Sequence, residues 1–146
     1  MNKKIIIRTL EKIALYMELQ AENPFKVSAF RKAAAALEAD ERSLSEIDDI
    51  TAIKGIGKGT ASVITELMEI GESTVLKELE AVVPKGLVPL MKLPGLGGKK
   101  LAKLYQELNI VDAATLKAAC EAGQVRGLAG FAAKTEEKIL KELETF

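Results

Sequence analysis

The fold prediction starts from residues 93–101, which read LPGLGGKKL. A second copy of the same pattern occupies residues 53–61, IKGIGKGTA, and a weaker third copy occupies residues 128–135, LAGFAAKT. Each copy has an apolar residue, one residue of any kind, a glycine, a second apolar residue and then a glycine or alanine. A small or basic stretch then opens an apolar-periodic helix. The repeat predicts three hairpins, each leading directly into a helix.

Glycines on both sides of one apolar residue allow a tight turn, including positive φ, while the apolar residue faces the core. The next helix then begins at once, and its first amides have no partner within the helix. Without a Cβ at the glycines, an anion can approach these amides closely, and Lys58, Lys99 and Lys100 add positive charge. Such contacts reach the phosphate backbone and do not read base edges.

The repeat has two other possible interpretations. Any protein can make a helix–helix turn with Gly-x-Gly, and a dinucleotide fingerprint needs a preceding strand and a further glycine, which this sequence lacks. Two clean copies with lysine at the helix start favour nucleic-acid binding. The third copy has Ala132 in place of the second glycine, and Glu136 and Glu137 follow it. We therefore expect the third hairpin to be structural.

The rest of the chain also has a helical period. Ile6, Leu10, Ile13 and Met17 mark one face of a first helix, and a second should run over residues 25–39. Ser43-x-x-Glu46 is a capping-box pattern that predicts a short helix. No stretch alternates as a strand does, so the expected fold class is all-α.

The segment Pro84-Lys85-Gly86 is the expected boundary between two small helical subdomains, residues 1–83 and 84–146. The first holds 11 basic and 14 acidic side chains, a net charge of −3, and the second 10 and 7, a net of +3. The acidic stretch 38–49 is expected to face away from DNA, because it opposes six carboxylates with one arginine.

Composition narrows the functional classes further. The 146 residues hold 21 basic and 21 acidic side chains, so nucleic-acid binding must come from local placement of charge. There is no histidine, which excludes imidazole nucleophile relays and imidazole metal sites, and the single Cys120 cannot form an internal disulfide. No apolar run is long enough to span a bilayer, because Arg8 and Glu11 interrupt the N-terminal stretch. These charges and the absence of a small-residue cleavage site also argue against a signal peptide. A monomeric protein of the cytoplasm is the expectation.

Together with the hairpins, residues 23–33, NPFKVSAFRKA, carry a family resemblance. The whole chain resembles the N-terminal region of a family X DNA polymerase, of the DNA polymerase beta-like kind, and is most similar to bacterial members. The resemblance implies a lyase-type helix-hairpin-helix domain over 1–83 and a fingers-like subdomain over 84–146. In that family the first grips the 5′ side of a gap and the second the primer side. Gap-filling synthesis in base excision repair is the implied role.

The resemblance also assigns residues. Its DNA-binding set comprises Gly55, Gly57, Lys58, Gly59, Thr60, Gly95, Gly97, Gly98, Lys99 and Lys100. The 5′-phosphate pocket would hold Lys26, Phe30, Arg31 and Lys58, although the family's pocket tyrosine is Phe30 here and a second pocket lysine is Gly59. A monovalent cation, K⁺ or Na⁺, would bind the main-chain carbonyls of Thr51, Ile53 and Ile56 and of Met91, Leu93 and Leu96.

No catalytic residue is expected in these 146 residues. The polymerase palm, with its Mg²⁺-binding aspartates, would begin about where this sequence ends at Phe146. Where family members carry a lyase lysine, this chain has Val63, and a valine cannot form a Schiff base. A deoxyribose-phosphate or abasic-site lyase using another lysine, and a protein-docking helical module, remain the alternatives to DNA binding.

Overall fold

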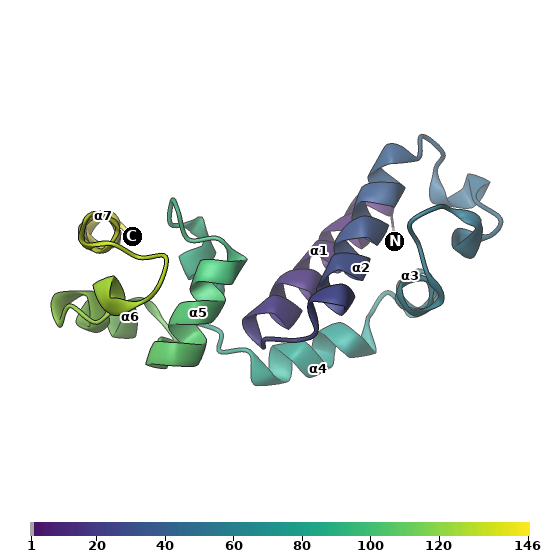
Figure 1. Ribbon diagram of the computed structural model, residues 1–146. Helices are drawn as coiled ribbons and strands as arrows, with labels where there is room; N and C mark the ends of the chain where they lie inside the picture. Colours follow the sequence, from purple (N-terminus) through teal and green to yellow (C-terminus); the bar gives the residue numbers. More distant parts are fainter. Residues whose placement is uncertain (1) are drawn as a thin grey trace. The chain divides into compact units, whose positions relative to one another are not determined.

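The computed structural model describes residues 2–146, and over that range it contains helices and no strands, which confirms the all-α prediction (Figure 1). None of the helices in this range is both long enough and apolar enough to cross a membrane. The α-helices are α1 (Lys3–Leu19), α2 (Pro24–Ala39), α3 (Lys58–Ile70), α4 (Thr74–Val82), α5 (Gly98–Leu108), α6 (Ala113–Glu121) and α7 (Ala133–Glu144). Four short 3-10 turns are η1 (Leu44–Glu46), η2 (Ile50–Ala52), η3 (Val88–Lys92) and η4 (Val125–Gly127).

The chain packs as two compact units. The first contains the described residues up to Glu18 together with Glu22–Ala81, and the second contains Leu19–Ala21 and Val82–Phe146. Each unit therefore holds its own hairpins: one in the first unit and two in the second.

In the first unit, α1 buries the predicted face, with Ile6, Leu10 and Ile13 fully buried and Met17 nearly so. The side chain of Asn23 caps α2 by accepting a hydrogen bond of 2.8 Å from the Phe25 amide. These observations confirm both predicted helices.

The acidic segment after α2 is ordered by its own side chains. The Ser43 amide donates to the Glu46 carboxylate at 3.2 Å, so the predicted capping box is present, although it opens only the three-residue turn η1. Asp49 accepts from the Thr51 amide at 2.9 Å and starts η2, the turn that enters the first hairpin. The hydrogen bonds from Thr51 lower the pKa of Asp49 below its usual value.

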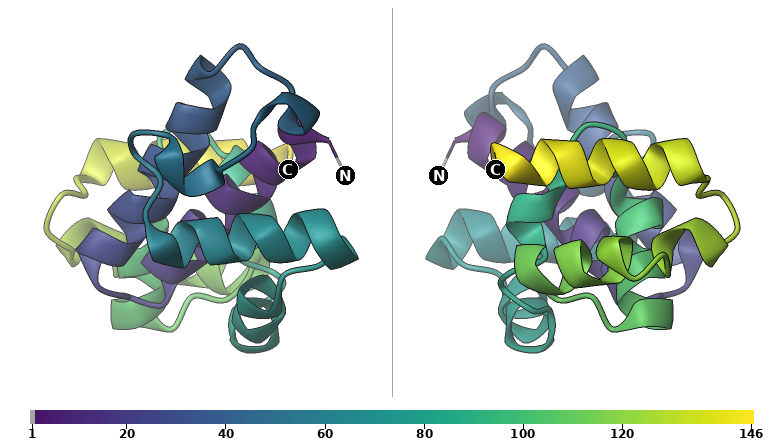
Figure 2. Two further views of the ribbon diagram at one scale, coloured as in Figure 1. Left: turned by 90° about the vertical axis from the view of Figure 1, so that its right-hand side faces the viewer. Right: turned by 90° about the vertical axis from the view of Figure 1, so that its left-hand side faces the viewer.

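In the second unit, Gly86 lies against the start of α6. A Cβ at this position would be 2.6 Å from the Val111 carbonyl oxygen, so only glycine fits. Asp112 caps α6 by accepting from the Thr115 amide at 2.8 Å, and hydrogen bonds from Thr115 lower the pKa of Asp112. α7, the yellow helix in Figure 2, packs on α6.

Candidate nucleic-acid interface

All three hairpins have the same backbone course. The first glycine of each pattern has positive φ: +102° at Gly55, +82° at Gly95 and +87° at Gly130. This left-handed conformation strongly favours glycine. The apolar residue that follows is buried in every copy, as expected, and these residues are Ile56, Leu96 and Phe131. Each also donates its amide to the carbonyl three residues earlier, at 3.1, 3.1 and 3.0 Å respectively.

The second small residue has a different role from the first. Gly57, Gly97 and Ala132 cap α3, α5 and α7 with φ of −89°, −79° and −120°. These are extended conformations that any residue adopts, so the expectation that both glycines serve the turn holds only for the first. Gly57 and Gly97 also leave space open at the helix start, because a Cβ there would meet nothing within 4 Å.

The helix starts at α3 and α5 combine unpaired amides with lysines. The first backbone bonds of these helices are donated by Ala61 to Gly57 and by Leu101 to Gly97. The amides of residues 58–60 and 98–100 therefore precede the first helical donor. Lys58, Lys99 and Lys100 have exposed side chains, and neither helix has an acidic residue in its first turn. The sequence-predicted DNA-binding residues thus come together as one cluster in each unit.

Thr60 contributes differently from the other predicted residues. Its side chain is buried, and its hydroxyl donates to the Gly57 carbonyl at 3.2 Å. Only its amide remains for a ligand, whereas the flanking Gly59 is exposed and has nothing within 4 Å of its would-be Cβ.

The third hairpin carries a buried carboxylate that sequence reasoning missed. Glu136, in the first turn of α7, is 1% exposed. It accepts from the Arg126 amide at 2.8 Å and from the Arg126 Nε at 2.9 Å. The ten-residue separation matches no local motif, and the sequence indicated only an acid near the turn. The Glu136 carboxylate therefore links α7 to the η4 turn that precedes the third hairpin.

Only two of the four residues predicted for the 5′-phosphate pocket are exposed and unpaired in the described structure. Lys26 and Lys58 are exposed. Phe30 is 8% exposed, so its ring belongs to the core of the first unit. Arg31 forms an ion pair with Glu18 at 3.1 Å, which raises the pKa of Arg31, so the guanidinium stays charged but its charge is compensated within the protein. Lys26 and Lys58 are the uncommitted cations of this predicted set.

The predicted cation loops consist of uncharged carbonyl oxygens, a donor set that suits hard cations such as K⁺ and Na⁺. The carbonyls of Ile53 and Leu93 each already accept one amide, from Ile56 and Leu96. Each carbonyl oxygen has a second lone pair available to a cation. Within residues 2–146, no group of three or more His, Cys, Asp or Glu residues could hold a metal ion.

The position of the family's lyase lysine lies in the core. Val63 is 5% exposed on α3, beside Ala61 at the same exposure. A side chain here faces the packed interior of the first unit, so both its chemistry and its burial are unsuited to attack on a sugar.

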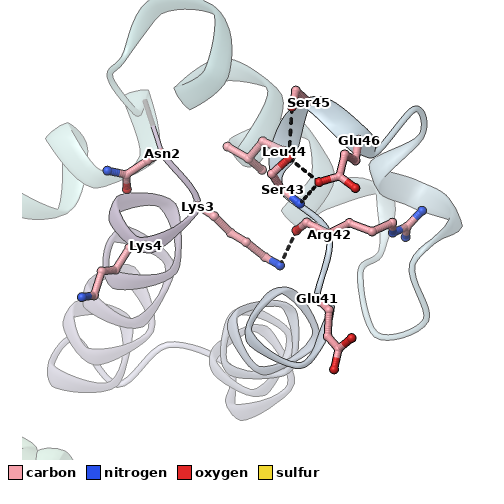
Figure 3. Close-up of a pocket in the computed structure, with 9 residues that line it drawn as sticks. All are labelled: Asn2, Lys3, Lys4, Glu41, Arg42, Ser43, Leu44, Ser45 and Glu46. Atoms are coloured by element: carbon pink, nitrogen blue, oxygen red, sulfur yellow. Dashed lines mark hydrogen bonds between the residues drawn. The ribbon is translucent and has the colours of Figure 1, made fainter.

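A surface depression of about 610 Å³ lies between the start of α1 and the acidic segment (Figure 3). Two of its three cations, Lys3 and Arg42, are engaged by the chain itself. The Lys3 ammonium donates to the carbonyls of Asp40 and Arg42, and the Arg42 guanidinium pairs with the Asp40 carboxylate at 2.7 Å. That pairing holds the pKa of Asp40 well below its usual value. The third cation, Lys4, is exposed.

Comparison with known proteins agrees with this geometry. The chain is 66% identical over 143 residues to the DNA polymerase/3′-5′ exonuclease PolX of Bacillus subtilis (strain 168). The match covers 98% of this chain and the N-terminal 25% of that relative, so the chain spans about a quarter of its length. The inferred resemblance to the N-terminal region of a family X polymerase is thereby confirmed. Residues 1–73 match the helix-hairpin-helix domain, and the chain belongs to that family.

Proposed function

We propose that this chain binds DNA through its backbone phosphates, as the N-terminal part of a family X DNA polymerase. The observation that carries the proposal is the repetition of one arrangement in two separate units. Each has an open capping glycine, unpaired amides at a helix start and exposed lysines, with no acid in the first helical turn. Helix starts of this kind attract phosphate.

The finer proposal is that the DNA is a gapped or nicked duplex and that the parent protein serves gap-filling repair. Two phosphate-binding hairpins in separate units suit two separate backbone segments, such as those on either side of a gap. Lys26 and Lys58 supply charge for a 5′-phosphate on the first unit. A K⁺ or Na⁺ ion on the hairpin carbonyls would add positive charge beside the bound backbone.

Salt dependence of binding tests the proposal. Anisotropy titrations of a labelled gapped duplex should give a log–log slope of about −3 to −4, as expected for roughly four neutralised phosphates. A protein-docking module would show almost no binding and no such slope. Titrations with and without the 5′-phosphate, repeated on Lys26→Ala, test the finer proposal, because the variant should lose any preference for the phosphate.

A lyase is the alternative from the enzyme class. Borohydride trapping on a gapped duplex bearing a 5′-deoxyribose phosphate should give no adduct, since Val63 lies buried where family members hold the nucleophile. An efficient adduct that a single Lys→Ala substitution abolishes would overturn this and identify a substitute lysine.

A further inference from the structure

One lysine of the second hairpin rests on the third hairpin. The Lys100 ammonium lies over the ring of Phe131, 5.8 Å from the ring centroid. Lys100 is exposed, whereas Phe131 is 7% exposed. Both residues belong to the second unit. The flexible lysine side chain therefore lies on a ring that is packed into the core.

The ring is a fixed platform because the third hairpin is held on two sides. Glu136 bonds the amide and Nε of Arg126 just before the turn. From α5, the Lys103 ammonium donates to the Ala129 carbonyl at 2.8 Å, one residue before Gly130. The segment that presents Phe131 is thus tied both to α7 and to the helix that carries Lys100.

A lysine held by an aromatic ring keeps its charge available to a ligand, whereas a cation held by a carboxylate does not. Arg31 is paired with Glu18, so its charge is compensated within the protein. An aromatic face attracts the ammonium without compensating its charge, and it leaves the outward hydrogens free to donate. The side chain loses rotamer freedom before any ligand arrives, which lowers the entropic cost of binding an anion.

We infer that Phe131 is a positioning residue for phosphate binding: it holds the Lys100 ammonium at the start of α5, so that the third hairpin supports the second. This inference rests on the proposed DNA binding. The inference gives a role to the third hairpin, in which Ala132 replaces the capping glycine.

A double-mutant cycle tests the inference, using Phe131→Leu, Lys100→Met and the double variant with the gapped duplex. Phe131→Leu keeps an apolar plug but removes the ring. It should weaken binding about three- to fivefold, the value expected of one exposed cation–π contact. In the Lys100→Met background the same substitution should change affinity less than about 1.5-fold. Equal losses in both backgrounds would overturn the inference, because they would mean that Phe131 acts only through packing.

The matched control is the Lys12–Tyr16 pair of α1, in which the ammonium lies 5.5 Å from a ring centroid outside the proposed interface. Tyr16→Leu and Lys12→Met should leave DNA affinity unchanged and uncoupled. Thermal unfolding identifies variants that fail to fold, and Phe131→Met replaces Phe131→Leu if the latter does.

A measurement without DNA separates this inference from the proposed function. In the free protein, the ring current of Phe131 should shift the side-chain protons of Lys100 upfield, and Phe131→Leu should abolish the shift. If the ring-current shift of Lys100 is present but the protein does not bind DNA, only the proposed function is refuted. Binding without a shift, or without coupling in the cycle, would refute the positioning role alone.

Discussion

The second and third hairpins share a backbone but differ at the helix that each one starts. The second continues into α5 with Gly97 as its cap and Leu101, fully buried, as its first helical donor. At the equivalent places the third has Ala132 and Glu136. At the N-terminus of α5, the positive end of the helix dipole, the first turn carries Lys99 and Lys100. At the N-terminus of α7 it carries the carboxylate of Glu136.

The loop thus determines the backbone course of a hairpin, and the first turn of the following helix determines which charges lie at the helix start. A positive-φ glycine and a buried apolar residue are present in both hairpins. Both helix starts have amides that precede the first helical donor, but only α7 has a carboxylate in its first turn, and this negative charge disfavours an external anion there. A hairpin pattern by itself therefore predicts a turn and not a ligand.

The largest expected effect is on stability, at Glu136. Glu136→Ala removes a buried acceptor and leaves the Arg126 amide without its partner, so the free energy of unfolding should fall by about 2–3 kcal/mol. Urea denaturation measures this. The exposed neighbour Glu137→Ala is the control and should change stability by less than about 0.5 kcal/mol. A loss that small at Glu136 would contradict the role of the carboxylate as a structural tie.

Cys120 reports on the same region of the second unit. Burial, with a further contribution from the negative charge of Glu136, raises the pKa of the Cys120 thiol to about 11 from an ordinary value of 9.0. At pH 8 its thiolate fraction should then be about a hundredfold below that of an ordinary thiol, because each pKa unit is a factor of ten. Alkylation should be slow in the native state and fast in urea, and Glu136→Gln should accelerate it. A native rate equal to the rate in urea would contradict burial of the thiol.

Gly95 and Gly97 of the second hairpin should separate stability from binding. Gly95→Ala forces a side chain into positive φ and should cost about 1–2 kcal/mol of unfolding free energy. Gly97→Val should cost less, yet weaken DNA binding more than Lys99→Ala, because it obstructs the amides themselves. Loss of one charge-assisted hydrogen bond is about tenfold or more in affinity. Ala132→Val in the third hairpin is the matched control, with affinity unchanged. Equal effects of Gly97→Val and Ala132→Val would remove the distinction between the hairpins.

The smallest expected effect concerns the acidic segment of the first unit. Asp48→Asn should change DNA affinity less than about threefold, through the long-range field alone. Asp48 is the cleaner choice, because Asp49 also holds the turn into the first hairpin through Thr51. A gain of tenfold or more would mean that this segment lies beside the bound DNA.

Much of the fold could be predicted from the sequence, because it depends on local patterns. The α1 face from Ile6 to Met17, the Ser43–Glu46 capping box and the positive-φ glycines all follow from spacing and residue type. The different roles of Gly95 and Gly97 could not be predicted, because the Gly-x-Gly pattern is symmetric and does not show which glycine has positive φ.

Long-range pairings were also beyond sequence reasoning. Arg31 looked available for a phosphate until the structure paired it with Glu18, thirteen residues earlier on another helix. Phe131 looked like a core plug, and nothing in the spacing indicated that Lys100 would lie over its ring. Such contacts depend on how helices pack, which no window of sequence contains.

The most direct test of the difference between the hairpins is the salt dependence of DNA binding by Lys99→Ala and Lys134→Ala. Both lysines are exposed at the second residue of their helices, α5 and α7. On one gapped duplex, Lys99→Ala should reduce the magnitude of the log–log salt slope by about 0.9, the value of one phosphate contact, whereas Lys134→Ala should leave it unchanged. Equal reductions for the two variants would contradict the account, because the third hairpin would then bind phosphate as the second does.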